Sequence, residues 1–203
     1  MSASWNRNRH TVLGLYGALI VLPSLVFGAL YWRSLTEDYE AELALVIGKR
    51  CSRVKSADAL DVIAGYSCFN DGSVREYQRK TSQWTPGKNF DGTGPFGPVV
   101  VTPDELPAGA SGLRITTRVN GQVRQQWPVG DMLYKLDELI SVLSQGMTLE
   151  PGEMLICGTV PGVGFEQLPQ IWLQHLDVVE TEISKIGVLR NVVKMRQAEQ
   201  VAQ

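Results

Sequence analysis

Tyr39-Glu40-Ala41-Glu42-Leu43-Ala44-Leu45-Val46-Ile47-Gly48 places two carboxylates directly before a five-residue apolar block that ends at a glycine. An apolar run of this length, bounded by Gly, is typical of a buried β-strand. Side chains alternate between the two faces of a strand, so Glu40 and Glu42 point to the same side, roughly 6.5–7 Å apart along the chain. The stretch therefore predicts a core strand with two acidic groups at its beginning.

Two like charges beside a hydrophobic core repel each other and lose hydration unless a cation neutralises them. A divalent ion would do so, because Mg²⁺ and Ca²⁺ prefer carboxylate oxygens. The alternative is that Glu40 and Glu42 lie on the solvated face of an edge strand, where neither needs a partner. Spacing alone leaves both interpretations open.

Further polar residues follow this strand in a particular order. Asp71 ends the segment Leu60–Asp71, Arg75 and Gln78 come next, and Lys88 lies in the loop Trp84–Asp91. A Glu-x-Glu strand, an Asp, an Arg and a Gln shortly after it, and then a Lys before an aromatic residue resemble the fumarylacetoacetate hydrolase family. The likeness covers about residues 38–193 and includes further blocks at Asn120-Gly121, Thr148-Leu149-Glu150-Pro151-Gly152, Gly158-Thr159-Val160-Pro161-Gly162-Val163-Gly164 and Ile186-Gly187-Val188-Leu189-Arg190-Asn191.

The length of 203 residues predicts one domain, with enough chain to form a hydrophobic core. Its 19 basic and 21 acidic residues produce no basic field, so nucleic-acid binding has no electrostatic support. The three cysteines are scattered and odd in number, which argues against a disulfide framework and for a reducing, cytoplasmic location. The two histidines lie far apart in the sequence, and no Cys/His cluster indicates zinc.

The N-terminal segment, residues 1–38, is atypical. Residues 11–32 carry no charge and are long enough to span a bilayer of about 30 Å, so this stretch is a candidate membrane anchor and the alternative location is membrane-tethered. A remnant strand region, with Leu19-Ile20-Val21-Leu22 as one buried strand, is the other interpretation. We expect the catalytic domain at 39–193 and a polar tail at 194–203.

Local patterns predict the remaining elements. We expect a short helix that Ser56 caps and Gly65 ends, a strand over 66–69, an ordered loop over 81–98 and a hairpin of 113–119 and 122–127 turning at Asn120-Gly121. A helix is predicted from Asp131 to Gly146, followed by strands over 154–157, 178–183 and 186–193. Many strands and few helices predict an α+β domain. The resemblance implies, more specifically, a mixed β-sandwich roll with a few short helices.

The resemblance also implies the site. Glu40, Glu42 and Asp71 would hold Mg²⁺, or Mn²⁺ or Ca²⁺ in its place, and would leave positions open for a bidentate 2-keto or 1,3-diketo acid. Lys88 and Thr159 would act in catalysis, and Arg75 and Gln78 would join them in binding the substrate. The ion would polarise a carbonyl and stabilise an enolate. Members of this family are commonly homodimers, and we expect the same here.

Each residue also has a plainer interpretation. Asp71 before Gly72 fits a turn, Arg75 and Gln78 fit a solvated helical turn, and Lys88 fits an exposed loop. Glu180 and Glu182 repeat the Glu-x-Glu spacing, and we assign them to the solvent face because no comparable series of polar residues follows them.

Family members usually carry a lid upstream with a His and a Glu that activate water. Here the upstream region is short and apolar, and the context of His10 does not match, so the general base is unassigned. We expect a metal-dependent hydrolase that cleaves a carbon–carbon bond in a small acylpyruvate or 2-keto acid. The alternatives are a decarboxylase or tautomerase of the same family, and a catalytically impaired, truncated paralogue that binds partners or a membrane.

Overall fold

The computed structural model describes residues 36–195, which form one compact unit. The predictions for residues 1–35, including the apolar stretch 11–32, and for most of the tail 194–203 lie outside the described residues. Within residues 36–195, no helix combines the length and the apolarity that crossing a bilayer requires. The three cysteines are all free thiols, as their scattered positions predict.

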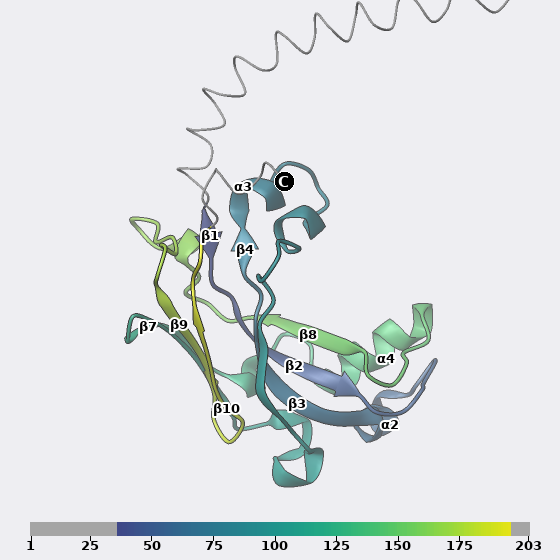
Figure 1. The fold of residues 1–203 in the computed structure, drawn as a ribbon. Coiled ribbons are helices and arrows are strands. Elements are labelled where there is room, and N and C mark those ends of the chain that lie inside the picture. Colours follow the sequence, from purple (N-terminus) through teal and green to yellow (C-terminus); the bar gives the residue numbers. More distant parts are fainter. Residues whose placement is uncertain (1–35, 196–203) are drawn as a thin grey trace, which may run out of the picture. The chain divides into compact units, whose positions relative to one another are not determined.

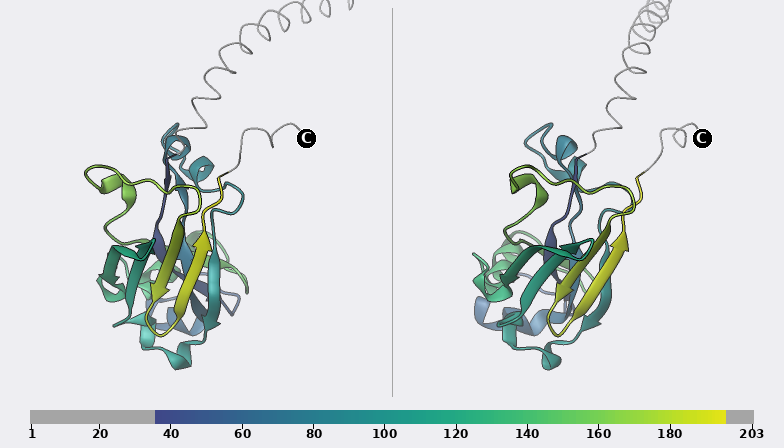
Figure 2. Two further views of the ribbon diagram at one scale, coloured as in Figure 1. Left: turned by 60° about the vertical axis from the view of Figure 1, so that its left-hand side comes forward. Right: turned by 90° about the vertical axis from the view of Figure 1, so that its left-hand side faces the viewer.

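Two four-stranded antiparallel sheets, with strand orders β5-β3-β2-β8 and β10-β9-β6-β7, pack face to face (Figures 1 and 2). The first sheet consists of β2 (Ala41–Ile47), β3 (Ile63–Asn70), β5 (Phe96–Val101) and β8 (Met154–Thr159). The second consists of β6 (Arg114–Val119), β7 (Gln122–Pro128), β9 (Val178–Ile183) and β10 (Gly187–Val192). Buried side chains of both sheets, among them Leu45, Tyr66, Ile115 and Ile183, form the core between them. The predicted α+β class is confirmed.

Short elements complete the unit. A two-stranded sheet pairs β1 (Glu37–Asp38) with β4 (Ser73–Val74), and β4 leads into α3 (Arg75–Gln78). The other helices are α2 (Ser56–Ala59) and α4 (Leu136–Gly146). Single 3-10 turns lie at Leu60–Val62, Thr85–Gly87, Pro103–Glu105, Ala108–Ala110, Val129–Asp131 and Gly164–Glu166.

The strand β2 forms where its sequence predicts it. Six of its seven residues are buried, because it is a central strand with β3 on one side and β8 on the other. The hairpin of β6 and β7 is also confirmed: Asn120 and Gly121 both have positive φ, as a two-residue turn of this kind requires. β8, β9 and β10 lie within one to two residues of their predicted bounds.

Three local predictions are wrong. Helix α2 is shorter than expected, since Ile63 to Gly65 already belong to β3 and pair with β2; Ser56 does not cap it, and its hydroxyl donates to Asp137 instead. The predicted loop over 81–98 ends in β5, whose Pro98 is tolerated because β5 is an edge strand. Helix α4 begins at Leu136 rather than at Asp131, after a 3-10 turn.

The topology brings three strand ends together. β2 is antiparallel to both neighbours, so its beginning lies beside the end of β3, where Ala41 faces Asn70, and beside the end of β8, where Glu42 faces Thr159. β1, β4 and α3 lie beyond this end of the first sheet (Figure 1). Polar residues from distant parts of the chain therefore meet at one place.

Candidate metal centre

Three carboxylates converge where these strand ends meet. Glu40, Glu42 and Asp71 each offer an oxygen, and these oxygens all lie within 4.8 Å of one another. Glu40 and Glu42 are buried, and Asp71 is half-buried. Ligands on opposite sides of a Mg²⁺ or Ca²⁺ ion are about 4–5 Å apart, given metal–oxygen distances of about 2.0–2.6 Å. The cluster thus has the spacing of a site for a hard divalent ion.

Backbone pairing fixes the position of each carboxylate. The amide of Asp71 donates to the carbonyl of Glu40 at 2.9 Å, which extends the β2–β3 pairing by one residue. The amide of Glu40 donates to the side chain of Asn70, also at 2.9 Å. Glu42 accepts a hydrogen bond from the amide of Gly158, at the end of β8. Glu42 thus lies in β2, and Glu40 and Asp71 directly adjoin the paired ends of β2 and β3, so the sheet positions all three acids.

Burial and mutual repulsion disfavour the ionised forms of two of these acids, Glu42 and Asp71. Burial raises the pKa of the Glu42 carboxyl to about 8, and the charge of Asp71 adds to the rise, while the hydrogen bond from Gly158 opposes it. Burial also raises the pKa of Asp71, and Lys88 counteracts part of that rise. A raised carboxyl pKa means that the ionised form is disfavoured, as expected where like charges share a dry site.

Lys88 points into the cluster. Its ammonium group donates to Glu40, to Asp71 and to Ser73, each at 2.6 Å. The loop that carries it can approach because Gly87 has no side chain: a Cβ there would lie 2.5 Å from atoms of Gln78 in α3. Lys88 is thus partly buried among anions, and the exposed-loop interpretation is wrong.

Asp38, which the sequence analysis did not single out, is the acid behind the cluster. It is fully buried and accepts two hydrogen bonds from the guanidinium of Arg75, at 2.7 and 3.0 Å. It also accepts the backbone amides of Tyr39, Gly164 and Phe165, at 2.7 to 3.0 Å. Asp38 therefore ties the glycine loop after β8 to the beginning of the first sheet. The sequence signal for it was its spacing, since Asp38 stands two positions before Glu40, as Glu40 stands two before Glu42.

The rest of the Arg75 guanidinium completes this connection. It contacts Glu40 at 2.6 Å and donates to the side chain of Gln78 at 3.0 Å. Arg75 and Gln78 are both buried, so the solvated-turn interpretation is wrong for them. The Arg75 guanidinium faces the protein's own carboxylates and holds Glu40 in place, while Gln78 accepts a hydrogen bond from Arg75.

The charges of this group fit a divalent ion. Four carboxylates (Asp38, Glu40, Glu42, Asp71) face two cationic side chains (Arg75, Lys88), which leaves two negative charges when all are ionised. A buried cluster with such an excess is costly unless it is neutralised. Mg²⁺, Mn²⁺ and Ca²⁺ prefer oxygen ligands, and the charge of one such ion would balance the two excess negative charges.

Thr159 lies at the edge of the cluster, and its hydroxyl is already hydrogen-bonded. It donates to the carbonyl of Ala41 at 2.9 Å and accepts from the amide of Gln125 at 3.0 Å. The glycine loop beyond it packs closely on Asp38: a Cβ at Gly164 would lie 1.8 Å from the carbonyl of Ile171 and 2.8 Å from Asp38. Gln125, buried on β7, was not predicted, because its position follows only from the packing of the two sheets.

The cluster opens into a cleft of about 620 Å³. All seven predicted site residues line it, and so do Arg79, Trp84, Phe165 and Glu166, which were not predicted. No histidine of the described residues lines the cleft; His175 is exposed and accepts the amide of Met195. The cleft is large enough for a small acid and has both charged and aromatic walls.

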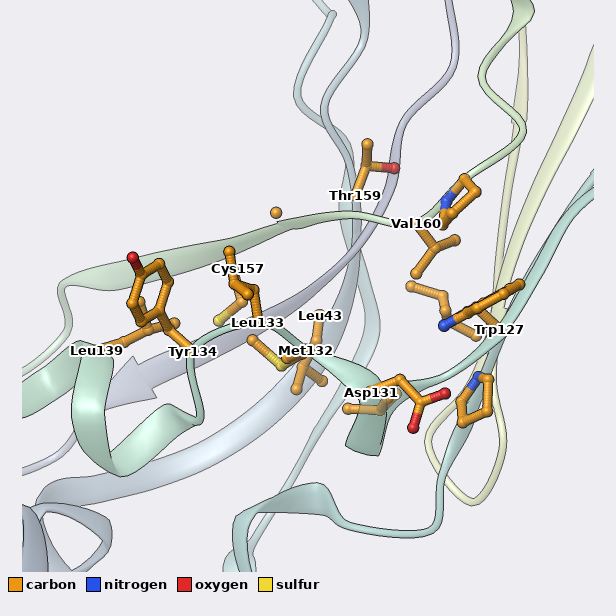
Figure 3. A pocket seen from close by; sticks show the side chains of 15 residues that line it. Leu43, Trp127, Asp131, Met132, Leu133, Tyr134, Leu139, Cys157, Thr159 and Val160 are labelled. Atoms are coloured by element: carbon orange, nitrogen blue, oxygen red, sulfur yellow. The ribbon is translucent and has the colours of Figure 1, made fainter. Parts of the chain in front are cut away.

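A second cavity, of about 370 Å³, is shown in Figure 3 and shares residues 158–161 of its lining with the acidic cleft. Trp127, Met132, Leu133, Tyr134 and Leu139 project into it from β7, from the loop before α4 and from α4 itself. Among the described residues that line it, Asp131 alone is charged. This cavity lacks the grouped carboxylates and cations of the first, so we place the candidate site in the acidic cleft.

Comparison with known proteins identifies relatives over most of the chain. The family model "Fumarylacetoacetate (FAA) hydrolase C-terminal" matches residues 5–194. Oxaloacetate tautomerase FAHD2A, mitochondrial, of Bos taurus is 40% identical over 184 residues, which are 90% of this chain and 55% of that protein. The chain therefore spans about half the length of the curated relatives it matches.

Solved structures agree in fold. A fumarylacetoacetate hydrolase from Exiguobacterium antarcticum is 40% identical with a TM-score of 0.77, over 80% of this chain and 58% of that one. A 5-carboxymethyl-2-hydroxymuconate delta-isomerase from Mycobacterium smegmatis is 36% identical with a TM-score of 0.72, over 80% and 60%. These likenesses confirm the predicted fold, and their names cover both hydrolase and isomerase chemistry.

Proposed function

Because the chain belongs to the fumarylacetoacetate hydrolase family, we propose that it is a metal-dependent enzyme that interconverts the keto and enol forms of a small 2-oxo acid. The observation that carries the proposal is the convergence of Glu40, Glu42 and Asp71 in a cleft with two negative charges in excess. Bound there, the ion would polarise the 2-oxo group and stabilise the charge of the enolate. Oxaloacetate, named in the relatives, is a 2-oxo acid of this kind.

The protein's own groups have defined tasks in this proposal. Lys88 places an ammonium group beside the site, where it can donate to the oxygen on which negative charge grows. Arg75 and Asp38 hold Glu40 and the glycine loop in position. Thr159 and the backbone from 158 to 161 form the wall against which the acid would lie.

Tautomerisation suits this cleft because it moves a proton and needs no activated water. Hydrolysis needs a base to deprotonate water; among the residues described the cluster contains no His, and its Glu40, Glu42 and Asp71 carboxylates would bind the ion.

Hydrolytic carbon–carbon cleavage of an acylpyruvate is the second candidate. Glu166 favours it, as a carboxylate that lines the cleft outside the cluster. In that reaction Glu166 would take a proton from water, the hydroxide would add to the acyl carbonyl, and the breaking bond would leave its electrons on a pyruvate enolate.

The test measures both reactions with one preparation. The purified protein is incubated with enol-oxaloacetate and, separately, with an acylpyruvate, in Mg²⁺ and after EDTA treatment, and the loss of enol absorbance is followed. We expect Mg²⁺-dependent ketonisation well above a control with Asp71→Asn protein, which corrects for catalysis by free Mg²⁺. Turnover that is unaffected by EDTA would contradict the role of the ion. Cleavage of the acylpyruvate without ketonisation would favour the second candidate.

The predictions of a homodimer and of a cytoplasmic location stay predictions. So does the third alternative, an impaired paralogue that binds partners; it requires that metal-loaded protein turn over neither compound.

A further inference from the structure

Arg79 follows α3 directly and lines the cleft at an exposed position. Its guanidinium carbon lies 4.4 Å from the centroid of the Phe165 ring, which is the distance of a cation–π contact. Arg75 lies beside the same ring, at 5.9 Å. One aromatic side chain thus has a buried guanidinium and an exposed one next to it.

The cations of the cleft differ in their partners. Arg75 and Lys88 are committed to the acids of the cluster. Arg79 has no ion pair with any acid among the residues that the structure describes, although Glu166 lines the same cleft. Among the cleft's described cations, Arg79 is therefore the one that remains for an anionic ligand.

The surroundings hold this guanidinium at the cleft. Phe165 is held on both sides, because its backbone amide donates to Asp38 at 3.0 Å and the centroid of its ring lies 6.2 Å from that of the Trp172 ring. Stacking uses the flat face of a guanidinium and leaves the N–H groups of its edge available for a carboxylate. The side chain is thus oriented before a ligand arrives, which reduces the entropy lost on binding.

We propose that Arg79 binds the second carboxylate of the substrate and so makes the site selective for dicarboxylic 2-oxo acids. The inference rests on the proposed function, in which the 2-oxo acid end of the molecule occupies the position between Glu40, Glu42 and Asp71. The far carboxylate then extends toward the mouth of the cleft, where Arg79 is stacked on Phe165. A monocarboxylic 2-oxo acid uses the same chelating end and gains nothing from Arg79.

The experiment compares two ligands of nearly equal shape on four proteins. Oxaloacetate and its 4-methyl ester differ in one negative charge, and KM for each is measured with wild-type protein, Arg79→Gln, Arg79→Lys and Lys80→Gln. Lys80 is the matched control, since it also stacks on an aromatic ring, at 3.6 Å from Tyr77, but does not line the cleft.

We expect Arg79→Gln to raise KM for oxaloacetate at least about tenfold, the usual size of a lost hydrogen bond to a charged group, with kcat nearly unchanged. For the ester, Arg79→Gln should change KM less than about twofold. Lys80→Gln should leave KM for both ligands unchanged. Arg79→Lys should give a KM for oxaloacetate between those of wild type and Arg79→Gln, because an ammonium point charge replaces the forked guanidinium.

A binding measurement separates this inference from the proposed function. 3,3-Dimethyloxaloacetate has no proton to lose at C3, so its affinity for the Mg²⁺-loaded proteins, and that of its 4-methyl ester, can be measured by calorimetry without keto–enol conversion. Preference for the diacid that Arg79→Gln abolishes supports the inference even if wild-type protein proves inactive. If folded Arg79→Gln protein lost affinity equally for both ligands, or lost affinity for neither, the inference would be overturned while the proposed function stayed intact.

Discussion

Two Glu-x-Glu pairs occur in this chain, on β2 and on β9, and they have different fates. Glu40 and Glu42 are buried at the beginning of β2, beside a third acid. Glu180 and Glu182, on the central strand β9, are half-exposed. The same spacing therefore places two acids on one strand face in both cases, but only one pair takes part in a cluster of carboxylates.

Neighbouring strands account for the difference. Glu182 contacts Arg118 of β6 at 2.5 Å, and Glu180 contacts Arg190 of β10 at 3.5 Å, so each acid of this pair has its own arginine. Glu40 instead shares Arg75 with Asp38 and shares Lys88 with Asp71, while Glu42 has no ion pair within the described part of the chain. An acidic pair thus indicates a metal site only where the surrounding cations are too few.

The largest effect should come from removing the acid that anchors the β2 cluster. Asp38→Asn removes one of the two carboxylates that face the buried Arg75 and weakens the hold on the glycine loop, so we expect a loss of about 3–5 kcal/mol in the free energy of unfolding. Urea denaturation measures it, with Glu180→Gln as the matched loss of one charge. If the two variants were equally stable, the contrast between the two sites would be wrong.

Metal binding should separate the pairs next. Glu42→Gln and Asp71→Asn each replace a charged carboxylate ligand with a neutral amide. We expect the affinity for Mn²⁺ to fall at least about a hundredfold, which is more than the loss of an outer-shell partner causes. The double variant Glu180→Gln/Glu182→Gln should bind as wild type does. Calorimetric titration gives both numbers, and circular dichroism checks the fold.

The pH dependence follows from the raised pKa of Glu42, about 8, whose first cause is burial. Below this pH the ion must displace a proton, so the affinity for Mn²⁺ should rise with pH by up to about tenfold per unit and level off above about pH 8.

The metal-free protein should behave in the opposite sense. The folded state holds this proton at pH values where the unfolded chain, with a pKa near the ordinary 4.5, has lost it, so unfolding stability should fall as pH rises from about 4.5 to 8. Saturating Mn²⁺ should abolish that fall. A metal-free stability that increases over this range would contradict the assignment.

The smallest effect is expected at the second pair. Glu182→Gln breaks a half-exposed contact with Arg118, which should change the free energy of unfolding by less than about 1 kcal/mol. Thermal or urea unfolding measures it. A loss as large as that of Asp38→Asn would mean that exposure does not explain the difference between the pairs.

Much of the fold could be predicted, because its strongest signals are local. The apolar run of β2 and the Asn120-Gly121 turn specify their elements by themselves. The strand β5 could not be predicted, since Gly97 and Pro98 are tolerated only at the edge of a sheet whose order the sequence does not state. The residues Ile63 to Gly65 fit a helix end locally but are required by pairing with β2.

The candidate site was predictable in its members and not in their contacts. The order of Glu40, Glu42, Asp71 and Lys88 indicated the cluster through family resemblance. The partner of Arg75 could not be predicted, because it depends on a long-range contact. Arg75 faces Asp38, 37 positions away, and the place of Arg79 depends on its contact with Phe165, which the sequence does not indicate.

The most direct test of the account is anomalous diffraction at the manganese edge from crystals soaked in Mn²⁺. We predict one strong peak in the cleft, within ligand distance of carboxylate oxygens of Glu40, Glu42 and Asp71, and none at Glu180 and Glu182. A cleft that stays without a peak at saturating Mn²⁺, or a peak held by other residues, would contradict the claim that these three acids form one divalent-ion site.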